Sequence, residues 1–168
     1  MNEIKNVQNL HYMDGALVKP QPSPCHVLVD GAWVYSETAA KRVLNKKRSD
    51  YSALIESRSN AVRNAIIGDP AKTLEYTLTA TEAELYLQDG GEIPSSVQAW
   101  ADFKSISPAM ASAEIISKAN QVKKALSELR VLRFKYRTQG GNALSLQVLD
   151  ESKEAFLKEI YLFERKYA

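Results

Sequence analysis

The chain has few of the residues on which metal sites, disulfides and nucleophilic catalysis depend. Its 168 residues include one cysteine, Cys25, and two histidines, His11 and His26. A single cysteine excludes an internal disulfide, and these three side chains are too few for a four-ligand structural zinc site. Cys25 and His26 also make a poor catalytic dyad, because successive side chains of an extended segment point to opposite sides. We therefore expect no metal and no cofactor.

Long apolar runs are also missing. No run approaches the 18 residues of a membrane-spanning helix, and residues 1–6 lack the charged-then-apolar layout of a secretory signal. Charge is nearly balanced, with 22 Lys and Arg against 20 Asp and Glu, and 45% of the residues are hydrophobic. This composition predicts a folded protein that does not enter a membrane.

Motifs of the common enzyme classes do not occur. The sequence has no Walker loop, GxGxxG, HExxH or GxSxG motif. Glu82 and Glu84 resemble a carboxylate pair, but both stand three residues after a threonine, which is the spacing of a helix capping box. We expect a protein that is not an enzyme and has no catalytic residues.

The first 35 residues have the pattern of short hairpins. Asp30-Gly31 separates Val27–Val29 from Ala32–Tyr35, and an Asp-Gly pair between such runs predicts a two-residue type I′ turn. Asp14-Gly15 predicts a second hairpin, and the proline-rich connector of residues 20–24 should be extended. Two small hairpins bury little apolar area, so this arm should need a partner surface.

From Ser36 onward the apolar residues follow a helical period. Ser36 is a suitable N-cap for a helix of about 31 residues that ends before Gly68-Asp69-Pro70. Shorter helices are expected over residues 80–88 and from Pro94, and a long one over residues 108–138. A last helix should begin near residue 150 or 151 with Phe156, Ile160, Phe163 and Tyr167 on one face. Residues 71–79 fit either a strand or a helix.

These elements predict a mainly α protein. An N-terminal β-hairpin arm (1–35) precedes a helical body (36–141) and a C-terminal amphipathic helix (142–168), which together give a bundle of two long helices, two short helices and the terminal helix. The spacing of Ile115, Val122, Leu129 and Tyr136 forms a heptad seam, which closes either within one chain or between chains.

Charge is segregated along the helical body. Residues 36–67 carry seven basic and three acidic side chains, residues 68–107 two basic and seven acidic, and residues 108–138 seven basic and two acidic. The simplest interpretation is that the acidic segment packs near both basic helices. The alternative is that the basic clusters at Lys46-Lys47-Arg48 and residues 130–137 bind nucleic acid, which the near-neutral total charge makes unlikely.

Apolar and aromatic residues at the two ends of the chain are the candidate partner-binding residues. The terminal helix has apolar side chains outside its main stripe, and the arm is too small to be stable alone. The candidates are Val27, Val29, Trp33, Tyr35, Leu157, Tyr161 and Leu162.

Several segments resemble proteins of bacteriophage tails. Thr79–Leu87, a glycine-bearing turn and Ile93–Ala101 resemble a segment of small tail-associated proteins of tailed bacteriophages, and Ala113–Ile116 with Leu129–Arg133 fits the same layout. Val29–Val34 is similar to a β element that introduces the helices of tail-fibre and tail-fibre-assembly proteins. The sequence departs from this pattern at Gln88–Gly91, where an aromatic-glycine pair is expected, and in its last 30 residues.

This resemblance implies a non-enzymatic component of a phage tail or tail-fibre assembly. Its partners would be other tail or fibre proteins, with a homo-oligomer as a further option, and its location would be the host cytoplasm during assembly and then the virion tail. The alternatives are an assembly chaperone that is not retained in the virion and a nucleic-acid-binding helical protein.

Overall fold

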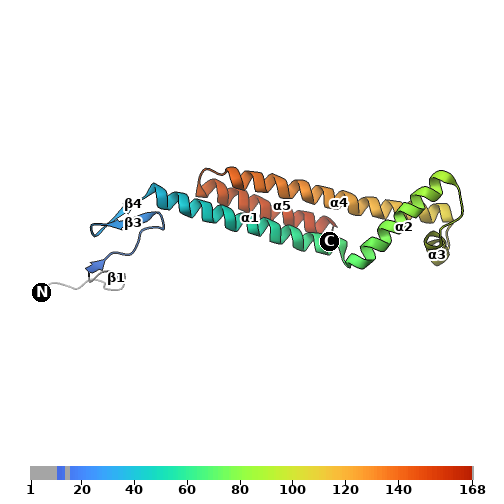
Figure 1. Cartoon of the computed structure of the whole chain (residues 1–168), viewed down its shortest axis with the longest axis horizontal. Coiled ribbons are helices and arrows are strands. Elements are labelled where there is room, and N and C mark those ends of the chain that lie inside the picture. The colour runs from blue at the N-terminus through green and yellow to red at the C-terminus, as the bar shows by residue number, and fades with distance from the viewer. Residues whose placement is uncertain (1–10, 14–15, 168) are drawn as a thin grey trace.

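The computed structural model describes residues 11–13 and 16–167, which form four short strands and five helices (Figure 1). In chain order the elements are β1 (His11–Met13), β2 (Ala16–Val18), β3 (His26–Val29), β4 (Ala32–Tyr35), α1 (Glu37–Ile67), α2 (Pro70–Asp89), α3 (Ser95–Lys104), α4 (Pro108–Asn142) and α5 (Leu146–Tyr167). The expectation of a mainly α fold with an N-terminal β-hairpin is confirmed.

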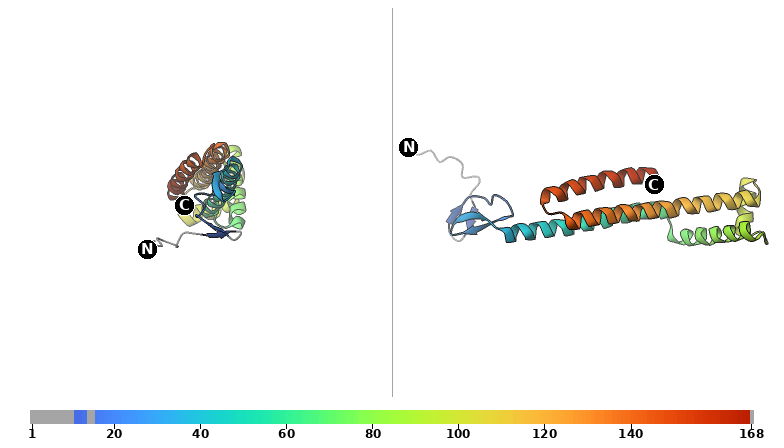
Figure 2. Two further views of the ribbon diagram at one scale, coloured as in Figure 1. Left: turned by 90° about the vertical axis from the view of Figure 1, so that its left-hand side faces the viewer. Right: turned by 90° about the horizontal axis from the view of Figure 1, so that it is seen from above.

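The molecule is elongated, because two of its helices are long and lie side by side. The 31 residues of α1 and the 35 residues of α4 correspond to about 46 and 52 Å of helix. Helix α5 packs against both to complete a three-helix bundle (Figure 2). Helices α2 and α3 cover the first part of α4 at one end of the molecule, and the strands extend from the other end (Figures 1 and 2).

The second hairpin has the predicted turn. Strands β3 and β4 are antiparallel, with Val27 opposite Val34 and Leu28 opposite Trp33. Asp30 and Gly31 both have positive φ angles, 47° and 79°, as a type I′ turn requires. Strands β1 and β2 form a separate antiparallel pair, whose predicted turn at Asp14-Gly15 lies outside the described residues.

Serine caps begin the two long helices where the sequence predicted them. The Ser36 hydroxyl accepts a hydrogen bond from the Ala39 N–H at 3.3 Å, and the Ser107 hydroxyl accepts one from the Met110 N–H at 3.3 Å. Each bond satisfies one of the backbone donors that a helix N-terminus leaves without an intrahelical partner. The expected length of α1 is also confirmed.

Helix α2 corrects the sequence interpretation of residues 71–88. It is one helix of 20 residues, so the segment left open as strand or helix is helical and the helix start expected at residue 80 is wrong. Thr77 and Thr81 donate their hydroxyl protons to the carbonyl oxygens four residues earlier, at 2.8 and 3.1 Å. Thr81 therefore bonds within the helix interior and does not act as a cap.

The end of α4 and the start of α5 also differ from the expectation. Helix α4 continues past Thr138 to Asn142, and α5 begins at Leu146, four or five residues earlier than the expected start at residue 150 or 151. Gly140 is buried in α4, and a Cβ at this position would lie 2.5 Å from Cδ1 of Tyr51 in α1. The glycine that suggested a helix end is instead a helical position at which Tyr51 requires the absence of a side chain.

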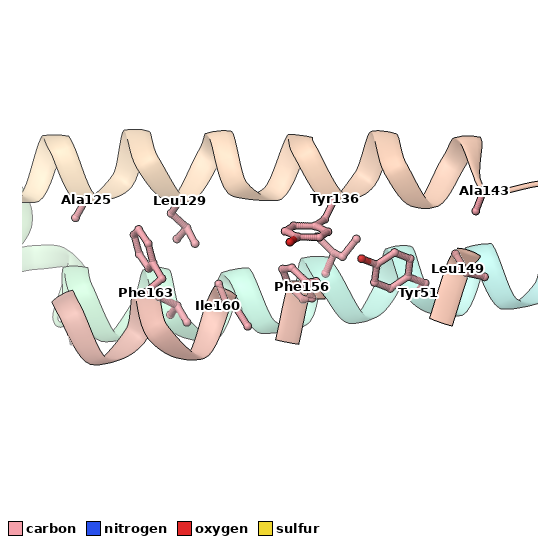
Figure 3. Close-up of a cluster of buried hydrophobic side chains, with 11 residues drawn as sticks. Tyr51, Ala125, Leu129, Tyr136, Ala143, Leu149, Phe156, Ile160 and Phe163 are labelled. Atoms are coloured by element: carbon pink, nitrogen blue, oxygen red, sulfur yellow. The ribbon is translucent and has the colours of Figure 1, made fainter. Parts of the chain in front are cut away.

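The main core lies between α1, α4 and α5 (Figure 3). Tyr51 and Ile55 of α1 pack with Leu129 and Tyr136 of α4 and with Phe156 of α5, among other apolar side chains. Helix α5, the terminal helix that the sequence predicted within residues 142–168, therefore shares one core with α1 and α4. The predicted α5 stripe is confirmed, since Phe156, Ile160 and Phe163 are buried and Tyr167 packs against them.

A second, smaller cluster joins α2, α3 and α4. Its buried members are Ala83, Val97, Ala101 and Ala111. The heptad seam of α4 contributes to both clusters, because Ile115 packs in this one while Leu129 and Tyr136 pack in the main core. Val122, between them, is 36% exposed. The seam therefore closes within one chain at both of its ends.

Ion pairs join the three long helices to one another. Glu56 of α1 pairs with Arg137 of α4 at 2.9 Å, and Lys135 of α4 pairs with Glu159 of α5 at 2.6 Å. The acidic segment packs on α4 through the small cluster described above. The expected packing of the acidic segment is therefore shown against α4, and the bundle carboxylates Glu56 and Glu159 pair with basic side chains of α4.

Candidate partner-binding surfaces

The candidate residues of the N-terminal hairpin lie on two different faces. Residues directly opposite in an antiparallel pair share a face, so Val27 and Val34 lie on the same side of the hairpin, together with Val29. All three are at least 39% exposed. Sequence reasoning missed Val34, although the alternation of side chains along residues 32–35 already placed it on the face opposite Trp33 and Tyr35.

Trp33 and Tyr35 occupy the opposite face. The indole Nε1 of Trp33 donates to the Lys19 carbonyl at 2.7 Å, which ties the proline-rich connector to the hairpin. Tyr35 is 60% exposed, and its ring makes an edge contact with the His26 ring at 5.9 Å between centroids. Trp33 therefore has a structural contact within the arm, and Tyr35 remains available to a partner.

The candidate residues of α5 also separate. With about 100° of rotation per residue, Leu157 and Tyr161 lie near one another on one side of the buried stripe, and Leu162 lies on the other side. All three are exposed, at 37%, 54% and 55%. Because the main stripe of α5 is already covered by α1 and α4, these residues are the flanks of a packed helix.

A further exposed apolar surface is on α2, where sequence reasoning placed no site residue. Leu74, Leu78 and Leu85 are 65%, 58% and 53% exposed. Their spacing of four and seven residues places them on one face of the helix, and we call these three residues the leucine stripe. The spacing was visible in the sequence, but the strand-like alternation of residues 74–78 obscured it.

The buried side chains of α2 are small, and its large apolar side chains are exposed on two faces: Tyr76 and Leu87 share the face of the buried alanines, and the leucine stripe lies opposite. The buried residues of α2 are Ala80 and Ala83, at 3% and 0% exposure. On a helix these alanines lie on the face opposite Leu74, Leu78 and Leu85. A helix that packs through alanines and exposes leucines leaves apolar area in water, which a further molecule can cover.

Acidic side chains border the leucine stripe. At 100° per residue, Glu82 and Asp89 lie beside Leu78 and Leu85 on the outer surface of α2, and Glu75 lies slightly further round. The Glu82 carboxylate also accepts a hydrogen bond from the Ser96 hydroxyl of α3 at 2.6 Å. The surface is therefore apolar with a negative border.

The basic residues that suggested nucleic-acid binding are largely engaged within the bundle. The Arg48 guanidinium donates through Nε to the Ala143 carbonyl at 3.2 Å, and Lys46 pairs with Asp50 at 3.0 Å. Hydrogen bonds from Lys135 and then from Tyr136 hold the pKa of Glu159 below its usual value. These contacts engage Lys46, Arg48 and Lys135 within the chain, so these three side chains are less available to a polyanion.

The described residues form no metal-ion cluster and no membrane-spanning helix. Among the described residues, no group of three or more His, Cys, Asp or Glu side chains is arranged to hold a metal ion. None of the helices described above is both long enough and apolar enough to span a bilayer. No protein-family model matches the chain, and no curated protein or solved structure shows significant similarity to it.

Proposed function

We propose that the chain is a non-enzymatic structural protein of a bacteriophage tail or tail-fibre assembly, and that it docks a neighbouring protein through the leucine stripe. The observation that supports docking is the inverted packing of α2, with alanines inside and leucines outside. The phage assignment depends on the resemblance of residues 79–137 and 27–67 to tail proteins. The docking mechanism stands independently of that assignment.

The occupant of the leucine stripe is a helix with an apolar stripe and a basic border. Leu74, Leu78 and Leu85 offer the ridge of a helix, which packs best against another helix. The border formed by Glu75, Glu82 and Asp89 favours Lys and Arg on the partner and disfavours acidic partners. The apolar contact would supply most of the affinity, and the charges would set orientation and association rate.

The arm and α5 supply secondary contacts. Val27, Val29 and Val34 form one apolar face of a hairpin whose two outer edges carry no strand partner among the described residues. A partner strand can add to either edge, as in β-augmentation. Tyr161 and Leu157 offer a smaller apolar contact on α5.

The docking proposal is tested with a double variant of the leucine stripe in the virus that encodes the chain. Leu74→Gln with Leu78→Gln should leave the protein folded and abolish its incorporation into tails, because exposed leucines contribute to binding and little to the fold. The matched control is Val131→Gln with Leu144→Gln, two residues that are 66% and 87% exposed and lie away from α2. Incorporation equal to wild type in the stripe variant would reject docking through α2.

Mass spectrometry of purified virions separates the proposed component from an assembly chaperone. A structural component remains in the particle at a fixed ratio to other tail proteins, whereas a chaperone is absent from it. Light scattering on the isolated protein tests another possibility, in which the leucine stripe binds a second copy of the chain. If the wild type is a dimer and the Leu74→Gln, Leu78→Gln variant is a monomer, the partner of the leucine stripe is a second copy of the chain and not a neighbouring tail protein.

A further inference from the structure

We infer that a pocket between α1 and α4 binds a phosphate group. The pocket has a volume of about 250 Å³ and is lined by Ser59 and Arg63 of α1 and by Leu126, Leu129, Arg130 and Arg133 of α4. It lies in the three-helix bundle, whereas the leucine stripe lies on α2. The inference therefore goes beyond the proposed docking function and does not depend on it.

Three guanidinium groups share this pocket with little compensating negative charge. Arg133 has a weak ion pair with Glu56, with Nη1 and Oε2 3.5 Å apart. Arg63 donates to the side-chain carbonyl of Asn60, which is neutral. Within the described part of the chain, neither Arg63 nor Arg130 forms an ion pair. Mutual repulsion among the three cations would be relieved by one bound anion.

Two buried polar atoms of the pocket residues have no partner. Ser59 is 1% exposed, and its hydroxyl oxygen makes no hydrogen bond. Nε of Arg133 is also buried and makes no hydrogen bond. Both atoms are closed to solvent, so a ligand that accepts from them requires the two side chains to turn toward the pocket. These bonds would recover the free energy that a buried polar group without a partner costs.

The chemistry of these groups selects a phosphate. A serine hydroxyl and guanidinium N–H groups all donate hydrogen bonds, and guanidinium groups match the geometry of phosphate oxygens through paired bonds. The volume equals about eight water molecules at ~30 Å³ each, which leaves room for one phosphate group and a few waters. Leu126 and Leu129 form the apolar side of the pocket, which reduces screening of the charges.

The test compares thermal unfolding in inorganic phosphate and in chloride at equal ionic strength. Phosphate should raise the midpoint of the wild type by about 3 °C or more at concentrations far above the dissociation constant. Arg63→Gln with Arg130→Gln should abolish this rise. Because phosphate also stabilises proteins without binding a site, the matched control removes the same charge elsewhere on the same helices, with Arg42→Gln and Lys123→Gln. The control should retain the full rise.

Ser59→Ala provides a variant that keeps all the charges. Without phosphate it should be at least as stable as the wild type, because a buried hydroxyl without a partner is removed. In phosphate its midpoint rise should be smaller than that of the wild type. Calorimetric titration should then show phosphate binding weakened by about tenfold or more in the double arginine variant.

A short single-stranded oligonucleotide identifies the source of the phosphate. Saturable binding of inorganic phosphate alone points to a small phosphorylated ligand. Binding of the oligonucleotide that is lost in the Arg63→Gln, Arg130→Gln variant, without a response to inorganic phosphate, points to the nucleic-acid backbone. The inference is overturned if neither probe binds, or if the double arginine variant and the control pair respond equally.

Discussion

Replacement of Gly140 by alanine tests the packing of α1 against α4. The new Cβ would lie 2.5 and 2.7 Å from two ring carbons of Tyr51. That ring is 3% exposed, its hydroxyl donates to the Ser152 carbonyl at 2.9 Å, and it contacts the Phe156 ring edge-on. The ring cannot withdraw without losing these contacts, so the helices must shift.

The size of the effect follows from two opposing contributions. Overpacking of a core costs about 1–3 kcal/mol, and exchange of glycine for alanine inside a helix returns up to about 1 kcal/mol. We expect Gly140→Ala to lower the free energy of unfolding by about 1–2 kcal/mol. For a chain of this length, the thermal midpoint should fall by about 3–6 °C.

Gly141 is the matched control for this substitution. It is the next residue in α4, and a Cβ there would meet no heavy atom within 4 Å. Gly141→Ala should therefore leave stability unchanged or raise it by up to about 1 kcal/mol. Urea and thermal unfolding of both variants decide the question. Equal stability of Gly140→Ala and Gly141→Ala would refute the packing of Tyr51 on α4.

Three further predictions concern charge, a helix end and the leucine stripe. A hydrogen bond from Lys135 depresses the pKa of Glu159 below its ordinary value of 4.5. The ionised Glu159 carboxylate therefore stabilises the fold above pH 4.5, and this stabilisation is lost as the pH falls through the folded-state pKa. On acidification the urea midpoint should fall less in Glu159→Gln than in the wild type. Arg48→Met removes the guanidinium hydrogen bonds to the Ala143 carbonyl, which follows α4, and should lower the free energy of unfolding in urea by about 1.5–3 kcal/mol. Unchanged stability of this variant would show that Arg48 does not stabilise the end of α4. Leu78→Gln should change the free energy of unfolding by less than about 0.5 kcal/mol, whereas Ala83→Leu, at a fully buried position, should lower it by about 1–3 kcal/mol. A larger loss of stability in Leu78→Gln than in Ala83→Leu would contradict the orientation of α2.

Features fixed by neighbouring residues were predictable from the sequence. The turn at Asp30-Gly31 needs two positive φ angles, and the caps at Ser36 and Ser107 need one hydroxyl three residues before a free N–H. Each involves at most a few consecutive residues, and in these three places the structure keeps the conformation that the local signal predicts. The face of α5 that carries Phe156 and Ile160 was predictable for the same reason, since helical spacing alone defines it.

Features that depend on distant residues were not predictable in this way. Gly140 and Gly141 suggested the end of a helix, but Gly140 accommodates a ring from a residue 89 positions earlier in the chain, so α4 continues. The start of α2 was placed ten residues too late, because capping-box spacings at Thr79 and Thr81 occur inside a longer helix. Local signals of this kind are overridden when tertiary contacts supply a greater stabilisation.

The candidate site shows the same division. Val27, Tyr35, Tyr161 and their neighbours were identified because apolar residues near chain ends are often available to partners, and they are exposed. They nevertheless fall on separate faces, and the leucine stripe of α2 was missed.

The sequence by itself determined that five helices follow the hairpin, how the long ones begin, and which side chains share a helical face. Only the tertiary structure decided which of those faces is covered. In α2 both an alanine face and a leucine face were available, and α4 covers the alanines. The reason is physical: periodicity defines the faces of a helix, but burial depends on the neighbour that packs against it. In α2 that neighbour is α4, which begins 19 residues after α2 ends.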